Sequence, residues 1–304
     1  MKKHFANISR PNMKTLHEYR KTVSGKAGRN RLMIQQDSQF NLFPSHAGLR
    51  KYVLYYNIAF PANDTFAAQY TLMPNACGTL SLAFDGTAVM AELWGASLTP
   101  VPLGTEPNSY RILLLIQLSP YGLYQITRQS QTEFAGKRLS LADIDSELFK
   151  SLHQAFVKSK TVTELANTCD QILYRRMEKL VVSDALVSAA ALISGSHGQV
   201  QVKEAARQSG YSERQLNRLF LTQIGMNIKH FARLTRFNYV LTQIQKSPCF
   251  FAALSQQAGY FDQAHFDKDF KDISGVSPQT YLKTMSDFYY DGMEIYHTIS
   301  SKEE

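Results

Sequence analysis

The 304-residue sequence has little cysteine: Cys77, Cys169 and Cys249 lie far apart, and no CxxC pair occurs. This scarcity argues against a disulfide framework and against a four-cysteine zinc site, and it suits a reducing cytoplasm. No apolar run approaches the roughly 20 residues that a membrane-spanning helix needs. The basic N-terminus lacks the apolar core of a secretory signal. We therefore expect a soluble, cytoplasmic protein with no membrane partner.

The sequence also lacks the short motifs of common enzymes. It contains no GxSxG, HExxH or P-loop motif and no paired catalytic carboxylates. Its eight histidines show no metal-ligand spacing with one another or with the cysteines. These absences predict no catalytic residue, no cofactor and no metal site. We interpret Cys77, in a turn with no Lys or His nearby, as a packed apolar side chain rather than as a thiol sensor.

Most of the net charge of +8 lies at one end of the chain. Residues 1–40 hold nine Lys and Arg against Glu18 and Asp37, and they have little apolar periodicity. A solvated, flexible leader is the interpretation that we prefer to a DNA-binding arm. The overall basic charge is therefore weak support for a nucleic-acid partner.

The pattern of apolar residues divides the chain in two. Between Tyr52 and Leu118, short β-branched and aromatic runs alternate with turn formers, which predicts a β-rich barrel or sandwich with flanking helices. The predicted strands are Tyr52–Phe60, Phe66–Met73, Thr79–Phe84, Ala88–Trp94 and Arg111–Leu118. Asp85-Gly86 predicts a hairpin turn. Trp94 and four tyrosines (Tyr52, Tyr55, Tyr56 and Tyr70) either line a pocket or pack in the sheet core.

After Pro120 the apolar residues recur at the spacing of an α-helix. From Asp184 onward the sequence has no strand pattern and predicts helices only. The predicted helices before the boundary are 122–131, 146–158 and 163–180, and the next is 184–194. An apolar stripe on the helix 163–180 is expected to pack on the sheet or on a second copy of the chain. We predict four segments: a leader at 1–40, a β-rich regulatory or dimerisation domain at 41–180, a helical domain at 181–290 and an acidic tail at 291–304.

An internal repeat of about fifty residues lies in the helical domain. Gly210-Tyr211 recurs as Gly259-Tyr260, 49 residues later. The pattern of Leu216, Arg218, Phe220 and Gly225 recurs 50 residues later as Phe266, Lys268, Phe270 and Gly275. One helical hairpin would be unremarkable, but the recurrence of these features in the same order indicates a functional unit.

Each copy predicts a helix, a sharp glycine turn and a second helix. Small residues near Ala206 and Ser255 allow close helix crossing, and the tyrosine after each turn glycine is expected to pack into the corner. Ser212 begins a capping box with Gln215, and Asp262 is the matching N-cap. The face opposite the apolar anchors stays polar. This arrangement is typical of a helix-turn-helix, whose second helix enters the major groove of DNA.

Together with the closing segment Gly275-Val-Ser-Pro-Gln-Thr-Tyr281, the two copies resemble the AraC/XylS family of bacterial transcription regulators over residues 200–282. The resemblance implies two helix-turn-helix units joined by a long helix, here residues 228–245, and a function in sequence-specific transcription regulation, as an activator. It implies double-stranded DNA as a partner, contact with RNA polymerase, and a small-molecule effector and a homodimer as further partners. The DNA-binding residues that we expect are Ser212, Glu213, Arg214, Gln215, Asn217, Arg218, Asp262, Gln263, His265 and Lys268.

In the second copy the family usually has Ser and Arg where this chain has Asp267 and Lys268, and Asp269 follows. Two carboxylates beside the lysine are expected to weaken its attraction to phosphate. The segment Leu72–Leu82 is similar to a Pro-Asp-Gly-Cys-x-Asp-Leu signature of a sensor domain found ahead of such regulators. Two alternatives stay open: a cupin-type enzyme fused to DNA-binding helices, against which the lack of histidine between Tyr52 and Leu118 argues, and a ligand-independent DNA-binding protein whose N-terminal half only dimerises.

Overall fold

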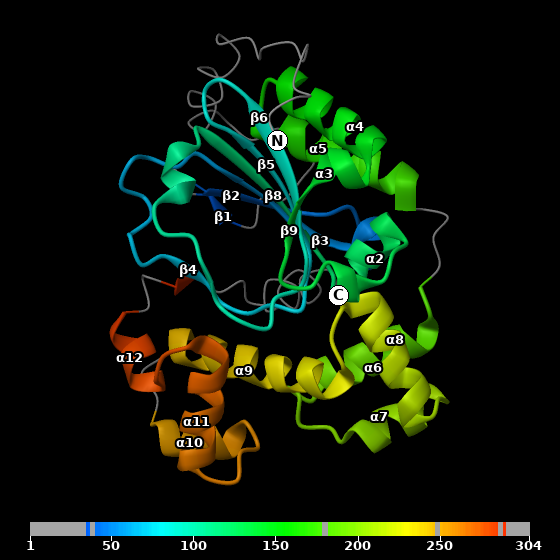
Figure 1. Ribbon diagram of the computed structural model, residues 1–304, viewed down its shortest axis with the longest axis vertical. Helices are drawn as coiled ribbons and strands as arrows, with labels where there is room; N and C mark the ends of the chain where they lie inside the picture. Colours follow the sequence, from blue (N-terminus) through cyan, green and yellow to red (C-terminus); the bar gives the residue numbers. More distant parts are fainter. Residues whose placement is uncertain (1–34, 37–39, 178–181, 247–249, 285–287, 290–304) are drawn as a thin grey trace.

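A β-rich N-terminal half with flanking helices is followed by a helical C-terminal half, as the sequence predicts (Figure 1). The structure, a computed structural model, describes residues 35–36, 40–177, 182–246, 250–284 and 288–289. The predicted acidic tail and most of the predicted leader lie outside these residues, as do residues 178–181 at the predicted domain boundary.

Seven strands form one antiparallel sheet, in the order β1-β2-β3-β8-β5-β6-β9. A second, three-stranded sheet has the order β10-β4-β7, and its strand β10 comes from the C-terminal end of the described chain. The strands are β1 (Gln35–Gln36), β2 (Phe40–Pro44), β3 (Val53–Ala59), β4 (Thr71–Leu72), β5 (Thr79–Phe84), β6 (Val89–Trp94), β7 (Val101–Pro102), β8 (Ile112–Leu118), β9 (Arg138–Ser140) and β10 (Phe288–Tyr289).

Four of the five predicted strands are confirmed, and the fifth is mostly wrong. The predicted run Phe66–Met73 contains only the two residues of β4. At the start of this run, the side chain of Asn108 forms two hydrogen bonds with the backbone of Phe66. The Phe66 N–H donates to Asn108 Oδ1 at 2.9 Å, and Asn108 Nδ2 donates to the Phe66 carbonyl at 2.8 Å. A side-chain amide thus satisfies backbone groups that a strand would pair with another strand.

The Asp85-Gly86 hairpin between β5 and β6 is confirmed. The carboxylate of Asp85 accepts hydrogen bonds from the backbone N–H groups of Thr87 (2.7 Å) and Ala88 (2.9 Å). Gly86 has φ +109°, which glycine adopts without a Cβ clash. These contacts lower the pKa of the Asp85 carboxyl, because the ionised form accepts the backbone hydrogen bonds.

Alternate residues of the central strands point to opposite faces of the large sheet. One face carries apolar side chains such as Tyr56, Leu80 and Leu114, which share a buried cluster with Leu165 and Leu173. The latter two belong to the predicted apolar stripe, which therefore packs within its own chain. The helices on this side are α3 (Leu141–Ile144), α4 (Ser146–Lys158) and α5 (Val162–Met177) (Figure 1).

The C-terminal half contains seven helices within the described residues. They are α6 (Asp184–Gly195), α7 (Val202–Ser209), α8 (Glu213–Ile224), α9 (Ile228–Lys246), α10 (Phe251–Gln257), α11 (Gln263–Ser274) and α12 (Pro278–Lys283). Helix α9 runs beneath the β-rich half and joins a right-hand group (α6, α7 and α8) to a left-hand group (α10, α11 and α12) in Figure 1.

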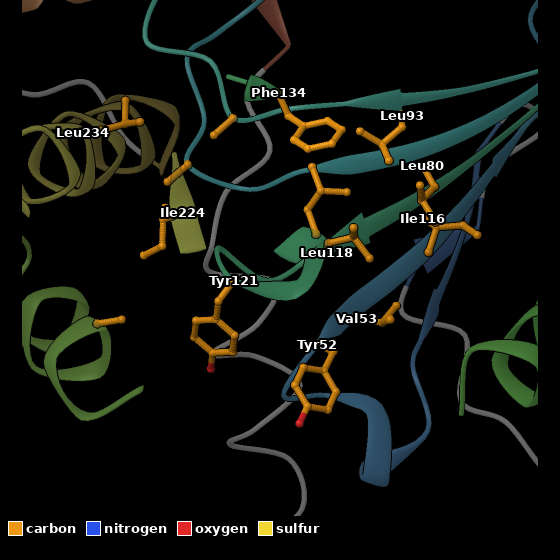
Figure 2. Packing of buried hydrophobic residues seen from close by; sticks show 14 of the residues in the cluster. Tyr52, Val53, Leu80, Leu93, Ile116, Leu118, Tyr121, Phe134, Ile224 and Leu234 are labelled. Atoms are coloured by element: carbon orange, nitrogen blue, oxygen red, sulfur yellow. The ribbon is translucent and has the colours of Figure 1, made fainter. Parts of the chain in front are cut away.

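One hydrophobic cluster extends through both halves of the molecule (Figure 2). It runs from Leu118 in β8 through Tyr121 and Phe134 to Ile224 at the end of α8. Helix α8 also packs against α2 (Gly122–Thr127) and the 3-10 turn η3 (Gln131–Glu133). The two halves are therefore joined by apolar packing as well as by the chain itself.

Candidate nucleic-acid interface

The sequence repeat is also a structural repeat. The turn glycines Gly210 and Gly259 have φ +73° and +74°, and the glycines that end the second helix of each copy, Gly225 and Gly275, have φ +92° and +79°. A positive φ of this size disfavours residues with a Cβ, so the glycines permit both the turn and the helix end. The two predicted helix-turn-helix units are confirmed as α7–α8 and α10–α11.

Side-chain caps start the second helix of each unit where the sequence predicts them. Ser212 Oγ accepts from the Gln215 N–H (3.3 Å), while the Ser212 N–H donates to Gln215 Oε1 (3.0 Å), which completes a capping box. In the second unit, Asp262 Oδ1 accepts from the His265 N–H (2.7 Å). The caps satisfy backbone donors that the first helical turn leaves free.

The two capped helices present the same pattern of burial. Residues 211–220 and 261–270 match position by position: five exposed residues, a buried anchor, and a second buried anchor four residues further on. The anchors are Leu216 and Phe220 in α8 and Phe266 and Phe270 in α11. The start of each helix, with its polar residues, is left accessible to a partner.

The predicted joining helix is confirmed as α9, 19 residues long. Its first turn is tied to α8, since the Ile228 N–H donates to Asn217 Oδ1 at 3.2 Å. Phe231 near its start packs on Phe220 of the first unit, and Phe237 packs on Phe270 of the second. These contacts connect both units to one continuous helix.

The ten predicted DNA-binding residues lie in the two matching segments. Asn217 is partly buried, and its side-chain oxygen bonds to Ile228; the other nine residues are exposed. The nine are Ser212, Glu213, Arg214, Gln215, Arg218, Asp262, Gln263, His265 and Lys268. In this part of the chain the structure gives no ion pair to Arg214, Arg218 or Lys268, so their charges are available to an external anion.

The environment of Asp269 differs from what the sequence suggests. Its carboxylate accepts from Arg233 Nε (2.5 Å) and from the Tyr260 hydroxyl (2.9 Å), and its side chain is 13% exposed. It is therefore directed toward α9 and not toward a phosphate beside Lys268. Asp267 has a different environment: partial burial raises the pKa of its carboxyl, and the Gln263 side chain opposes that rise.

The tyrosines that follow the two turn glycines, Tyr211 and Tyr260, differ in burial. Tyr260 is buried under the Arg236 guanidinium, which lies 5.3 Å from its ring centre, whereas Tyr211 is 40% exposed. The prediction that both tyrosines pack into the corner is therefore wrong for Tyr211. The extra residue in the second copy explains the difference, because Tyr211 matches Phe261 in the 50-residue register, and Phe261 is 92% exposed. Phe261 lies just before the N-cap Asp262 and is not among the ten predicted DNA-binding residues.

A second candidate site lies on the face of the large sheet that α4 and α5 leave free. A partly open cavity of about 320 Å³ lies between this face and the loops that carry β4, β7 and the 3-10 turn η2 (Glu106–Ser109). The sequence left open whether these aromatic residues line a pocket or pack in the sheet core. Trp94, Tyr55 and Tyr70 line the cavity, and Tyr52 and Tyr56 pack in the core.

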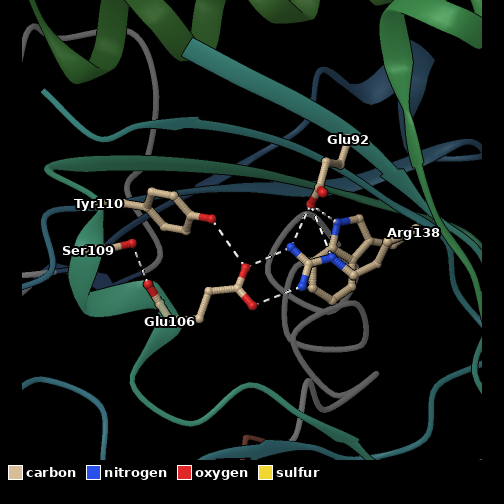
Figure 3. A network of polar contacts seen from close by, with 6 residues as sticks. Glu92, Glu106, Ser109, Tyr110 and Arg138 are labelled. Atoms are coloured by element: carbon tan, nitrogen blue, oxygen red, sulfur yellow. Dashed lines mark hydrogen bonds and ion pairs between the residues drawn. The ribbon is translucent and has the colours of Figure 1, made fainter. Parts of the chain in front are cut away.

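A charged network of residues that line this cavity is drawn in Figure 3. The Arg138 guanidinium donates to Glu92 (2.9 Å) and to both carboxylate oxygens of Glu106 (2.7 and 3.0 Å), and it lies 4.2 Å from the Trp94 ring centre. The hydrogen bonds from Arg138 lower the pKa of the Glu106 carboxyl. Burial and Glu106 raise the pKa of Tyr110 to about 12. No local sequence pattern predicts this network, since only the pairing of β6 with β9 places Trp94 opposite Arg138.

Cys77 also lines the cavity and is 5% exposed. Burial raises the pKa of its thiol to about 12. A thiol with such a pKa stays protonated near neutral pH and is a poor nucleophile. This environment agrees with our interpretation of Cys77 as a packed side chain.

Two helix-turn-helix units, each with an exposed polar helix start, define a class of protein, the DNA-binding transcription regulators. Residues 205–284 match a protein-family model described as "Helix-turn-helix domain". This match confirms the resemblance to AraC-type regulators for the C-terminal part of the chain. A search of curated proteins found no match.

Several solved structures show likeness at low sequence identity. The C-terminal domain of AraT, a response regulator from Geobacillus stearothermophilus, is 21% identical with a TM-score of 0.33, covering 34% of this chain and 88% of that one. An AraC-type regulator from Chromobacterium violaceum is 20% identical with a TM-score of 0.31, covering 33% and 89%. ToxT from Vibrio cholerae O395 is 11% identical with a TM-score of 0.37, covering 81% and 96%.

Within the described part of the chain, no helix has both the length and the apolar character that crossing a membrane requires. Within the same residues, no three His, Cys, Asp or Glu side chains gather as ligands of a metal ion would.

Proposed function

We propose that the protein is a sequence-specific transcription regulator whose helices α8 and α11 enter neighbouring major grooves of one DNA duplex. The observation that carries this proposal is the structural repeat: the same turn glycine, N-cap, pair of buried anchors and exposed polar helix start recur at an interval of 49 to 50 residues. A helix that enters the major groove contacts base edges with residues near its N-terminus.

The side chains at the two helix starts differ, so we expect the two units to read different bases. Arg214 in α8 is replaced by Ala264 in α11, and Gln215 by His265. Arginine recognises guanine through two hydrogen bonds, while alanine offers only a methyl contact. Arg218 and Lys268 occupy equivalent positions and carry the same charge, which suits a phosphate contact in both units.

The length of α9 supports binding on one side of the DNA. Nineteen residues of α-helix extend about 28 Å. Successive major grooves on one face of B-DNA are about 34 Å apart. Because α9 is continuous and packs on both units, we expect it to hold the two recognition helices at a fixed separation.

We further propose that the β-rich half senses a small molecule. The cavity supports this role, because ligand pockets of proteins have volumes from about 300 Å³ upward and are mostly apolar with a few polar groups. The segment from η3 to β9 connects the cavity to α8: η3 packs against α8, and Lys137 and Arg138, a few residues later, line the cavity. Contact with RNA polymerase, activation and a homodimer stay predictions of the resemblance.

Selection of DNA sites by the full-length protein tests the proposal. The protein is incubated with a random duplex library, bound molecules are enriched, and the affinity of the enriched site is compared with that of a scrambled duplex at several salt concentrations. We expect enrichment of a site with two half-sites and an affinity at least 10³-fold above the scrambled duplex. Equal affinity for both duplexes would contradict sequence-specific regulation.

A further inference from the structure

The floor of the cavity in the β-rich half has a polar part and an apolar part. Strand register places Tyr55, Gln117 and Thr79 side by side across β3, β8 and β5. The next cavity-facing row contains Asn57 and Ser81, on either side of Leu115. The row after that is apolar and consists of Ala59, Leu113 and Ala83. Polarity therefore falls along the strand direction within one cavity.

Two polar atoms of this floor have no hydrogen-bond partner among the residues that the structure describes. They are the Tyr55 hydroxyl and Asn57 Oδ1, and both are buried. Tyr55 is 3% exposed and Asn57 is 6% exposed. Buried polar groups of proteins are nearly always hydrogen-bonded, so each of these two atoms calls for a partner that the described residues do not supply. The two residues lie two positions apart on one strand and line the same cavity.

The charges in the cavity wall balance one another. Glu92 and Glu106 contribute two negative charges, and Lys137 and Arg138 contribute two positive charges. The Arg138 guanidinium is engaged by both carboxylates. At Arg138, an acidic ligand would have to displace a carboxylate and a basic ligand would have to displace the guanidinium, while Lys137 is exposed and has no ion pair among the described residues. The net charge of the wall is zero, which suits an uncharged ligand.

The rest of the wall suits an apolar, ring-bearing body. Phe66 lies between Phe40 and Tyr70, with ring centres at 6.2 and 4.5 Å. All three aromatic residues line the cavity, as do Leu72 and Leu103. Aromatic side chains pack against the faces and edges of other rings at such separations.

From this floor and wall we infer that the cavity binds an uncharged amphipathic molecule with a ring-bearing apolar body, whose polar end carries a carbonyl beside an N–H or O–H group. The Tyr55 hydroxyl donates to the carbonyl, and Asn57 Oδ1 accepts from the N–H or O–H. Both orphaned atoms are thereby satisfied. The inference rests on the sensor role proposed above, because it names the chemical class of the molecule that is sensed.

The test compares three naphthalene probes that differ only at the polar end. 2-Naphthamide carries a carbonyl and an N–H donor, 2-acetylnaphthalene carries the carbonyl alone, and 2-naphthoate carries a negative charge. Binding of each probe to the full-length protein is measured by thermal shift and by calorimetry. We expect the amide to bind most tightly and the carboxylate most weakly. No binding of the amide at millimolar concentration, or tighter binding of the carboxylate, would overturn the inference.

Variants of two neighbouring tyrosines distinguish a ligand site from a structural one. Tyr55→Phe removes a hydroxyl that has no partner among the described residues, so the melting temperature of the free protein should stay the same or rise. The affinity of the variant for 2-naphthamide should fall about tenfold. Tyr56→Phe is the matched control, because its hydroxyl donates to Asp170 at 2.8 Å on the other face of β3. It should lower the melting temperature and leave amide affinity unchanged. A Tyr55→Phe protein that melts lower and binds the amide equally well would contradict the inference.

A parallel measurement of DNA affinity, with and without the amide, separates this inference from the proposed function. Amide binding that leaves DNA affinity unchanged would confirm the ligand class and contradict the sensor role. DNA binding by a protein that ignores the amide would overturn the ligand class alone.

Discussion

Gly225, which ends the first recognition helix, lies against the backbone of Gln131 in the β-rich half. A Cβ atom on Gly225 would be 2.7 Å from the Gln131 carbonyl oxygen. Gly275 ends the second recognition helix with a similar positive φ, but a Cβ there would meet nothing within 4 Å among the described residues. The two glycines are thus alike in conformation and differ in what they touch.

This difference predicts unequal effects of the same substitution. In Gly275→Ala only the left-handed backbone conformation is penalised, at a cost of about 1–2 kcal/mol. In Gly225→Ala the same penalty is joined by a clash that pushes α8 away from η3. We expect Gly225→Ala to lower the melting temperature clearly more than Gly275→Ala and to reduce any effect of a cavity ligand on DNA binding. Equal melting temperatures of the two variants would contradict the tight contact between the halves.

The exposed arginines of α8 predict two different losses. Arg214, near the helix start, is placed to reach a base edge, so Arg214→Ala should cost about 1–3 kcal/mol and relax sequence preference at one base pair. Arg218→Ala should instead weaken all sites equally and reduce the slope of log affinity against log salt by about one. Binding measured on point-mutated sites over a salt series checks both. A uniform loss from both variants would show that the roles are assigned wrongly.

The Asp269 carboxylate holds Arg233 and Tyr260 together, so its removal should destabilise the second unit. Asp269→Ala leaves the buried Tyr260 hydroxyl without its acceptor and removes the shorter of the two ion pairs of Arg233, which should cost about 1–3 kcal/mol in the free energy of unfolding. Asp267→Ala, two residues away, is the control, because no ion pair to Asp267 occurs in the described structure. Chemical denaturation should show a lower midpoint for Asp269→Ala alone.

Asp267 predicts a pH dependence of stability. Its folded pKa is raised above the ordinary value of about 4, so folding favours the protonated acid. The stability that this group contributes is fully present below its unfolded pKa and is lost as the pH rises through its folded pKa. Asp267→Asn should therefore gain stability over the parent above about pH 5, while the two proteins converge near pH 3. An advantage of the variant that grows toward acid pH would contradict the raised pKa.

The same carboxylate also predicts an effect on DNA. Changing Asp267 to Ser and Lys268 to Arg together, as in the family pattern, should tighten DNA binding, most clearly at low ionic strength where repulsion of phosphate is least screened. The salt dependence should become steeper by one phosphate contact. Unchanged affinity and slope in the double variant would mean that α11 does not approach the DNA backbone.

The C-terminal half was largely predictable because local signals determine it. The caps at Ser212 and Asp262, the turn glycines and the buried anchors all lie within a few residues of the features they control. The ion pair of Asp269 with Arg233 was not predictable, because Arg233 lies on another helix and is 36 residues away in the sequence. The prediction that Tyr211 is packed was wrong because it paired Tyr211 with Tyr260, 49 residues later. In the 50-residue register that the burial pattern follows, Tyr211 corresponds to the exposed Phe261.

The β-rich half was predictable at the level of strands but not of the site. Strand β5 matches its predicted bounds, and the Asp85-Gly86 turn fixes its pairing with β6. Strand β9, only three residues long, has no distinctive pattern, yet its pairing with β6 brings Arg138 to the cavity. Local sequence also cannot separate Tyr55 from Tyr56, because which face of β3 meets the cavity depends on the whole sheet.

Footprinting of the full-length protein on its selected DNA site tests the central claim most directly. Two recognition helices joined by α9 should protect two major-groove segments on one face of the duplex, with centres about 10 base pairs apart. Arg214→Ala should weaken protection of one segment, and Lys268→Ala should weaken protection of the other. A single protected segment that both variants affect equally, or protection without sequence preference, would contradict the account.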